Sequence, residues 1–327
     1  MDLDPRLSQL HGWIREVFGD VQYTLEPASE DASFRRYFRV LSDHWRYIAV
    51  DAPPEKESNE AFVEVTHLLE AEGLPVPHIH YSLLDSGYFL LDDFGNTLFL
   101  DILDTENVDR LYGNALDALT VMQQIPANSL PRYSQELLLQ EMELFQQWFL
   151  GKLLDKKLSE STEKMLHNVF AQLKQNALVQ PQVFVHRDYH SRNLMKIDAN
   201  WPGIIDYQDA VCGPVTYDAV SLLRDCYIQW SPDRVKAWAL EYKERLMETN
   251  MACDVSDETF LKWFDLMGIQ RHLKAIGIFA RLSLRDKKTG YLKDIPRTLG
   301  YVKSVAPNYP ETQKLAEFIS DEVSFQL

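Results

Sequence analysis

The sequence is short of positive charge. Its 327 residues include 33 lysines and arginines against 49 aspartates and glutamates, which gives a formal net charge of −16. Nucleic acids and anionic membranes are bound through broad cationic surfaces, so this deficit argues against partners of either kind. A small anionic ligand is still compatible, because it needs only a local positive site. The sequence leaves the number of subunits open.

Cysteine is scarce as well, with three residues and no C-x-x-C pair. Because an odd number without paired spacing fits neither a zinc finger nor a disulfide scaffold, we expect three reduced thiols. No uncharged apolar run approaches the ~18 residues of a membrane span. Residues 1–5 also lack the basic and apolar regions of a signal peptide. These absences predict a cytoplasmic location.

What is present indicates a two-part α+β chain. The sequence is 46% hydrophobic, which is ample for a core, and its length fits about two domains of ~150 residues. Apolar spacing in the first 95 residues predicts two helices and several strands. The helices are expected over 6–18 and 59–72, and the β structure over 34–40, 47–50 and 88–91.

From residue 107 the pattern is helical, with one β interlude over 183–205. The sequence therefore predicts a small mixed lobe, 1–95, followed by a larger and mainly helical lobe, 96–327. The helices of the second lobe are expected over 111–124, 135–157, 160–176, 217–229, 232–247 and 258–284.

One polar loop in the β interlude carries a kinase pattern. Residues 186–193 read His-Arg-Asp-Tyr-His-Ser-Arg-Asn and match H-R-D-x-x-x-x-N, and a further apolar strand ends at Asp206. Phosphoryl transfer needs a carboxylate that accepts the hydroxyl proton and oxygen ligands for Mg²⁺. We therefore predict Asp188 as the base and Asn193 and Asp206 as the ligands of Mg²⁺.

The tripeptide Asp93-Phe94-Gly95 spells D-F-G but precedes the loop, whereas the metal-binding aspartate of a kinase follows it. We interpret residues 91–95 as the hinge between the lobes. Backbone groups around Asp92 and Asp93 would then bind the adenine of the nucleotide. A strand-ending turn explains the same residues equally well.

The loop and the residues after it resemble the aminoglycoside phosphotransferase-like kinase family. The resemblance extends from the loop through Ile205-Asp206 and Gly213-Pro214 to Tyr217-Asp218. It implies a two-lobed protein-kinase-like fold, ATP as the phosphate donor and a small hydroxylated acceptor. It also implies that His186 and Asp218 support the catalytic loop.

Four other segments resemble the N-acetylmuramate/N-acetylglucosamine anomeric kinases of bacterial cell-wall recycling: residues 31–39, 51–54, 270–274 and 279–286. This resemblance implies phosphorylation of the C1 hydroxyl of an amino sugar. An aminoglycoside, homoserine or choline kinase is the first alternative, and a nucleotide-binding pseudokinase is the second. The third is a metal-dependent hydrolase that uses His186, Asp188 and His190. The choice between ATP and GTP stays open.

The kinase pattern fails at two points in the first lobe. No G-x-G-x-x-G motif occurs there, and the candidate phosphate loop is 29–36, with Ser33, Phe34 and Arg35 as nucleotide contacts. The strand that carries the phosphate-binding lysine of kinases ends here in Asp51. We expect its carboxylate to repel the phosphates, although the anomeric kinases resembled above also carry aspartate at this point.

A different cation must then replace the strand lysine. The candidates are Lys56, which we favour because it lies close to the strand end, and Arg35 or Arg36 in the loop.

The acceptor site is expected in the second lobe. Arg271, Lys274, Arg281 and Arg285 fall on one stripe of the predicted helix from 258. A solvated helix face explains this stripe, and so does a docking face for an anionic group such as a lactyl carboxylate. The full set of predicted acceptor contacts is His190, Gln208, Asp209, Arg224, Arg271 and Lys274.

Overall fold

A computed structural model describes residues 4–29, 34–249 and 253–323. The chain divides into two compact units. The first unit consists of Met1–Thr97 and Met195–Asp209, and the second of Leu98–Leu194 and Ala210–Leu327. The first break lies two residues beyond the hinge expected at 91–95. The return of Met195–Asp209 to the first unit brings Asp206 into it, which periodicity does not indicate.

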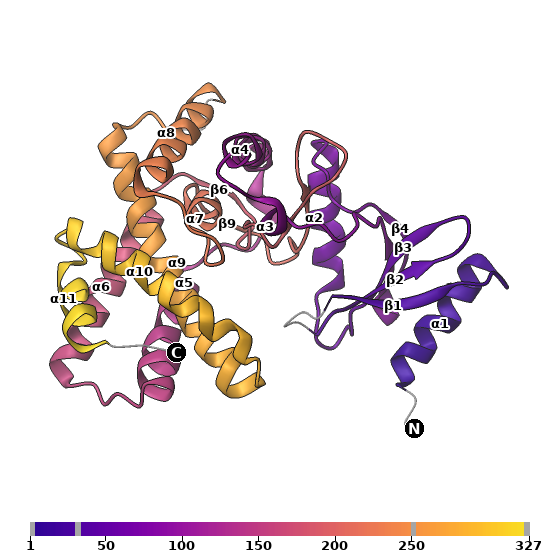
Figure 1. The fold of residues 1–327 in the computed structure, drawn as a ribbon, viewed down its shortest axis with the longest axis horizontal. Coiled ribbons are helices and arrows are strands. Elements are labelled where there is room, and N and C mark those ends of the chain that lie inside the picture. Colours follow the sequence, from indigo (N-terminus) through magenta and orange to yellow (C-terminus); the bar gives the residue numbers. More distant parts are fainter. Residues whose placement is uncertain (1–3, 30–33, 250–252, 324–327) are drawn as a thin grey trace. The chain divides into compact units, whose positions relative to one another are not determined.

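The first unit is built on a five-stranded antiparallel sheet in the order β1-β2-β3-β5-β4. Figure 1 shows α1 along one side of this sheet and α2 on the other. The strands are β1 (Thr24–Ser29), β2 (Arg36–Leu41), β3 (Arg46–Asp51), β4 (Ile79–Leu83) and β5 (Tyr88–Leu91). The helices are α1 (Pro5–Phe18), α2 (Asn59–Ala71) and the 3₁₀ turn η1 (Leu84–Ser86).

Side-chain alternation gives the sheet two distinct faces. One face packs on α1 through a core cluster that includes Leu10, Trp13, Val40, Ala49 and Tyr88. The other face meets α2, where the rings of Phe62 and Phe89 lie edge to face at 5.3 Å.

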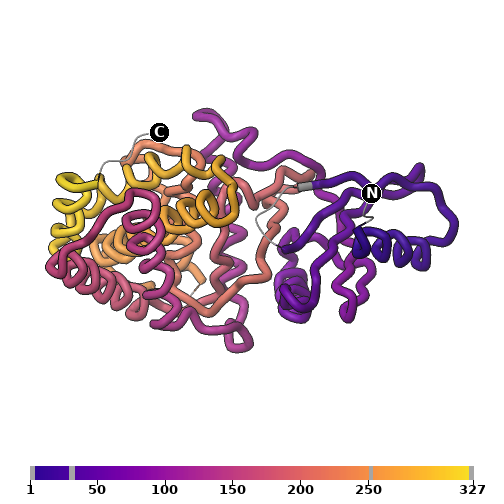
Figure 2. Tube along the Cα trace, turned by 90° about the horizontal axis from the view of Figure 1, so that it is seen from below, coloured from indigo at the N-terminus to yellow at the C-terminus, as the bar shows by residue number. Residues whose placement is uncertain are grey.

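The second unit is mainly helical around α9 (Asp257–Asp286), which packs against α5, α6, α7, α8 and α10. Figure 2 shows the orange and yellow C-terminal helices lying against the magenta segment from 135 to 178. The other α-helices are α3 (Phe99–Ile102), α4 (Val108–Gln124), α5 (Gln135–Leu144), α6 (Glu160–Leu178), α7 (Tyr217–Leu223), α8 (Pro232–Glu248), α10 (Ile295–Val305) and α11 (Gln313–Glu322). The π-helix η3 (Phe145–Leu153) continues α5, and 3₁₀ turns span Ala127–Ser129, Thr289–Asp294 and Ala306–Asn308.

Two short strand pairings matter for the site. β6 (Gln182–Val185) pairs antiparallel with β9 (Val211–Pro214) and leads directly into the polar loop. β7 (Leu194–Met195) pairs with β8 (Gly203–Ile204), which leads to Asp206. The loop and Asp206 are thus each carried by the end of a strand.

Several predicted helices are confirmed within one residue at each end, including those over 6–18, 59–72 and 232–247. The helix predicted over 217–229 is wrong in length, because the chain leaves the helical conformation at Arg224 (φ −120°, ψ 53°). The helices α10 and α11 and the strand β4 were not predicted.

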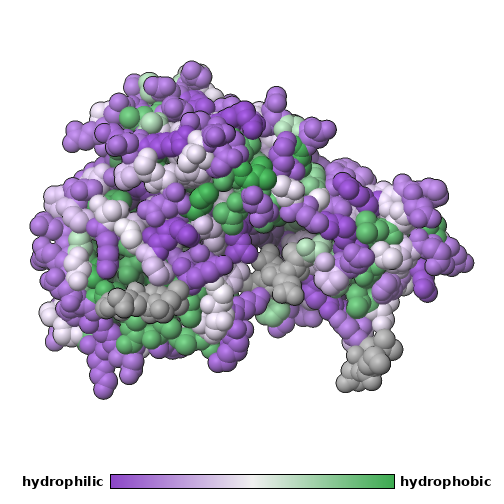
Figure 3. Space-filling model, in the orientation of Figure 1, coloured by the Kyte–Doolittle hydropathy of each residue, from purple (hydrophilic) through white to green (hydrophobic). Residues whose placement is uncertain are grey.

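No helix in the described ranges is long and apolar enough to cross a membrane. On the face drawn in Figure 3, hydrophilic side chains cover most of the surface, with smaller apolar areas between them.

Candidate active site

The polar loop begins with an unfavourable backbone turn. Arg187 has a φ of 77°, a left-handed conformation that residues other than glycine rarely adopt. The buried carboxylate of Asp218, on α7, accepts hydrogen bonds from the backbone N–H groups of His186 (2.7 Å) and Arg187 (3.0 Å). These two bonds hold the turn. The support predicted for Asp218 therefore has a direct structural counterpart.

Further hydrogen bonds fix the rest of the loop. The backbone N–H of Asp188 donates to His186 Nδ1 at 3.2 Å, and the side-chain amide of Asn193 donates to the carbonyl of Asp188 at 3.0 Å. Because Nδ2 of Asn193 is used in this way, its Oδ1 is the atom suited to a metal. The buried carboxylate of Asp225 accepts from both N–H and Oγ of Ser191.

The side chain of Asp188 differs from the groups that support it. No residue in the part of the chain that the structure describes donates a hydrogen bond to its carboxylate or forms an ion pair with it. Burial opposes its ionisation, but the charges of Lys274, His190 and Arg271 outweigh this effect and lower its pKa. Asp188 is therefore an ionised acceptor whose oxygen atoms can receive a hydroxyl proton.

A buried carboxylate that sequence reasoning missed, Glu141 on α5, lies at the centre of the nearby cations. Its Oε1 pairs with Arg187 Nη2 at 2.6 Å and with Lys274 Nζ at 3.0 Å. Tyr133 donates its hydroxyl to the other oxygen, and Lys274 also donates to Tyr217 at 3.0 Å. The position of Glu141 between buried Leu138 and Met142 on α5 was the available signal.

Three residues of the cationic stripe on α9 differ in their exposure to solvent. Arg271 and Lys274 are buried, at 6% and 8% exposure, so the solvated-face interpretation is wrong for both. Arg285 is exposed and pairs with its neighbour Asp286 at 2.8 Å, so that interpretation holds for it. The charges of buried Arg271 and Lys274 act on Asp188. These two residues are therefore the part of the stripe that can contact an acceptor.

Two other predicted acceptor contacts in the second unit have defined surroundings. His190 is buried, its ring lies edge-on to Tyr227 at 5.3 Å, and burial lowers its pKa. Arg224 forms an ion pair with Asp265 at 2.5 Å and lies over the ring of Phe264. The structure thus gives Arg224 a partner within the chain.

Asp206 lies in the first unit, at the end of the segment that follows β8. It also has a left-handed φ, 65°, and its Oδ1 accepts a hydrogen bond from Gln208 Nε2 at 2.8 Å. The following residue, Tyr207, stacks its ring on that of Phe62 in α2, with 5.6 Å between the ring centres and 5° between the ring planes. Its hydroxyl forms a hydrogen bond with the hydroxyl of Thr66 at 3.0 Å. These contacts fix Asp206 relative to α2. Asp209 is exposed.

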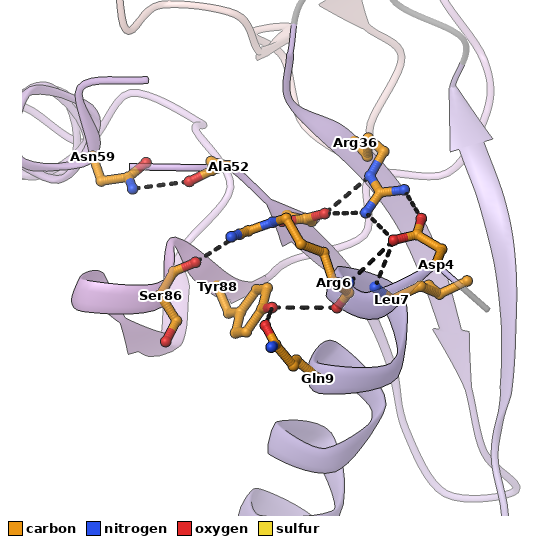
Figure 4. Close-up of polar contacts among 10 residues, drawn as sticks. Asp4, Arg6, Leu7, Gln9, Arg36, Ala52, Asn59, Ser86 and Tyr88 are labelled. Atoms are coloured by element: carbon orange, nitrogen blue, oxygen red, sulfur yellow. Dashed lines mark hydrogen bonds and ion pairs between the residues drawn. The ribbon is translucent and has the colours of Figure 1, made fainter. Parts of the chain in front are cut away.

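The expectation that Asp51 repels phosphates is wrong. Asp51 pairs across the sheet with Tyr88, so its side chain belongs to the α1 face and is fully buried there. It accepts hydrogen bonds from Arg6 Nε at 2.7 Å and Arg36 Nε at 2.9 Å. Figure 4 shows that Arg36 also reaches Asp4, which caps α1. Two guanidiniums therefore neutralise the carboxylate, and the cluster fastens α1 to the sheet.

The three candidate cations for the phosphates are placed differently. Arg36 is engaged by Asp51 on the α1 face, as above. Lys56 is exposed and its Nζ lies 5.4 Å from the ring centre of Phe34. Arg35 is buried, lies over Phe62 at 4.9 Å and pairs with Glu57 at 3.1 Å. Ser33, another predicted nucleotide contact, lies outside the described residues.

The residues predicted as a hinge are held by side-chain contacts. Asp93 accepts from Arg39 Nε at 2.7 Å and from the backbone N–H of Gly95 at 2.9 Å. The backbone N–H of Asp92 donates to the carbonyl of His78 at 3.1 Å. Asp93 also lines a pocket within the first unit, together with Arg46, Phe94, Lys196, Ile197 and Asp198.

The chain is similar in sequence to several known proteins. A model described as the phosphotransferase enzyme family matches residues 24–252. Two proteins named N-acetylmuramate/N-acetylglucosamine kinase, from Pseudomonas putida and Pseudomonas aeruginosa, are 40% and 41% identical over 97% and 98% of both chains. A protein of the same name from Neisseria meningitidis is 36% identical over 97% of both chains.

Solved structures of lower identity share the fold. An ADP-bound aminoglycoside phosphotransferase has a TM-score of 0.59 at 14% identity, with 91% of this chain and 98% of that chain covered. The choline kinase LicA from Streptococcus pneumoniae has a TM-score of 0.62 at 11% identity, with 91% and 99% covered. The predicted protein-kinase-like fold is thereby confirmed. With the family model matching more than half of its length, the chain belongs to the phosphotransferase enzyme family.

Proposed function

We propose that this protein transfers the γ-phosphate of ATP to the C1 hydroxyl of N-acetylmuramate or N-acetylglucosamine. The observation that carries the proposal is the near-complete alignment, at 36–41% identity, with three proteins that bear this kinase name. Because the reaction consumes ATP, we place it in the cytoplasm. The resemblance of residues 31–39, 51–54, 270–274 and 279–286 to anomeric kinases is what points to C1 rather than another hydroxyl.

In this reaction Asp188 orients the acceptor hydroxyl and receives its proton as the phosphoryl group moves to the oxygen. Its lowered pKa keeps it ionised at neutral pH, and no described hydrogen bond occupies its carboxylate oxygen atoms. Asp218 acts through the backbone, because its two hydrogen bonds hold the turn that presents Asp188.

Asn193 and Asp206 suit Mg²⁺ by the chemistry of their donors. One carboxylate and one amide oxygen are hard ligands, and Mg²⁺ completes its coordination with water and phosphate oxygens. The amide of Asn193 is oriented by its bond to the carbonyl of Asp188, and the carboxylate of Asp206 by Gln208. When bound, the ion would neutralise charge on the phosphates.

For the phosphates we propose Arg35 in place of the favoured Lys56. Arg35 is buried and pairs with Glu57 just before α2, which resembles the lysine–glutamate pair of kinases in charge and placement. It lies over Phe62, and Phe62 in turn stacks on Tyr207 beside Asp206. We retain the proposal that backbone groups of 91–95 bind adenine, with the N–H of Asp92 excluded because His78 already accepts it.

The charges near Asp188 disfavour the rival acceptors. Arg187, Lys274 and Arg271 all lower the pKa of Asp188, and Glu141 pairs with the first two alone. A choline or aminoglycoside cation would enter a region that is already positive. The acceptor surroundings therefore favour a neutral or anionic sugar.

The test is an acceptor comparison with purified protein, ATP and Mg²⁺, followed by ³¹P and anomeric-carbon NMR. We expect a sugar 1-phosphate from N-acetylglucosamine and from N-acetylmuramate, and no phosphorylated choline or kanamycin. Phosphate on another hydroxyl would contradict the C1 assignment. ATP binding without transfer to any acceptor would indicate a pseudokinase.

A further inference from the structure

Arg271 differs from the other buried cations of the second unit because it has no acidic partner. Lys274 and Arg187 share Glu141, and Lys243 pairs with Asp257 at 2.7 Å. Arg271 is only 6% exposed, yet no described carboxylate forms an ion pair with it. Its one described hydrogen bond runs from Nη1 to Cys226 Sγ at 3.7 Å, and its buried Nε has no partner.

Such an arrangement is costly for the protein alone. A buried charge is stable when it is paired and hydrogen-bonded, and a thiol is a weak acceptor. Asp225, which directly precedes Cys226 in the sequence, is already engaged by Ser191 and by the backbone N–H of Tyr227. A guanidinium has five donors, and a carboxylate that it binds through two of them satisfies charge and geometry together.

Arg271 interacts with the aspartate that we propose as the base. It lies on α9 one turn before Lys274, and its charge acts on Asp188. His190 of the catalytic loop is also buried, and its Nδ1 has no hydrogen-bond partner. The charge of Arg271 contributes to lowering the pKa of His190. Two buried polar groups, each with a nitrogen atom that has no partner, therefore interact electrostatically with Asp188, the proposed acceptor of the hydroxyl proton.

We propose that Arg271 binds the carboxylate of an anionic acceptor and so determines how strongly N-acetylmuramate is preferred over N-acetylglucosamine. The inference rests on the proposed function and extends it to specificity. N-acetylmuramate carries a lactyl carboxylate that N-acetylglucosamine lacks, so only the former can pair with the guanidinium. The neutral sugar leaves Arg271 as it is in the free protein.

The test compares both sugars in one set of variants, at saturating ATP. For Arg271→Gln we expect kcat/KM for N-acetylmuramate to fall about tenfold to a hundredfold, the value of a charge-assisted bidentate contact. The value for N-acetylglucosamine should stay within about threefold, because that sugar makes no ion pair. Arg271→Lys, which keeps the charge, should restore part of the loss. Arg285→Gln on the exposed end of α9 is the matched control and should change neither sugar.

Each alternative outcome is distinct. An equal loss with both sugars would overturn the proposal and make Arg271 a residue that positions the catalytic loop. Unchanged preference in Arg271→Gln would also overturn it. If Arg271→Gln does not fold, Arg271→Lys decides: a shifted preference supports the proposal, and wild-type preference with normal KM contradicts it. A wild-type protein that phosphorylates neither sugar would instead refute the proposed function itself.

Discussion

Two aspartates, one in each unit, have opposite surroundings. Each lies at the end of a strand or shortly after it. Asp51 ends β3 in the first unit and is bonded by two guanidiniums, Arg6 and Arg36. Asp188 follows β6 in the second unit and has cations near it, yet no described hydrogen bond reaches its carboxylate. In the first arrangement the carboxylate is neutralised by ion pairs within the chain. In the second it can still accept a hydrogen bond or a proton from a substrate.

The difference shows that a buried carboxylate can either stabilise the fold or take part in catalysis, depending on its hydrogen bonds. A carboxylate whose lone pairs are filled by its own chain fastens elements together, as Asp51 fastens α1 and β2. A carboxylate that nearby cations hold ionised without bonding it is prepared for a substrate. The same contrast separates Lys274, which Glu141 pairs, from Arg271, which it does not.

The largest expected effect is on catalysis at Asp188. Asp188→Asn removes the proton acceptor while preserving shape, so we expect kcat to fall about a hundredfold to ten-thousandfold, the usual value of a general base. The dissociation constant for ATP, measured by calorimetry, should change little because Asp188 contacts the acceptor. A large loss of ATP binding would show that the substitution damages the nucleotide site instead.

The next effect is on stability at Asp51. Asp51→Asn leaves two guanidiniums without their carboxylate, and removing one partner of a buried pair costs ~3–5 kcal/mol. Because about a third of each arginine side chain is in water, we expect ~1–3 kcal/mol here. Thermal unfolding should shift down accordingly, whereas Asp254→Asn, an exposed aspartate, should unfold like the wild type. An unchanged melting temperature would show that the cluster contributes nothing.

A moderate effect is expected on the nucleotide. Arg35→Met should raise KM for ATP about tenfold if its charge reaches the phosphates, since one charge-assisted hydrogen bond is worth roughly 1.5–3 kcal/mol. Lys56→Met is the matched control, and KM there should stay within about twofold. The opposite pattern, with Lys56 sensitive and Arg35 insensitive, would restore the original expectation.

A further effect is a pH dependence of stability. Burial raises the pKa of Asp218 to about 7, against about 3.9 in an unfolded chain. Between these values the unfolded chain loses the proton while the folded protein keeps it, so the contribution of Asp218 to stability falls as the pH rises from about 4 to 7. The wild-type free energy of unfolding minus that of Asp218→Asn should decrease over this window and be level above it. Urea unfolding of both proteins at several pH values measures the difference, and a difference that rises with pH would contradict the shift.

Much of the fold could be predicted from apolar spacing, because helices such as 59–72 and 232–247 have a clear buried face. The catalytic loop could be predicted because four residues at fixed spacing carry its chemistry. Glu141 and the α1 face of Asp51 could not, since both depend on which residues meet across the fold. A one-residue change of register reverses the face of a strand residue, and the kinase alignment of Asp51 carried no information about register.

The most direct test of the account compares Asp51→Asn and Asp188→Asn side by side. Both variants lose one carboxylate and keep an amide of the same shape. At a temperature where circular dichroism shows both folded, turnover of ATP and N-acetylglucosamine is measured for each. We predict that Asp51→Asn stays within about threefold of the wild type and that Asp188→Asn falls at least about a hundredfold. Wild-type turnover in Asp188→Asn, or a comparable loss in folded Asp51→Asn, would contradict it.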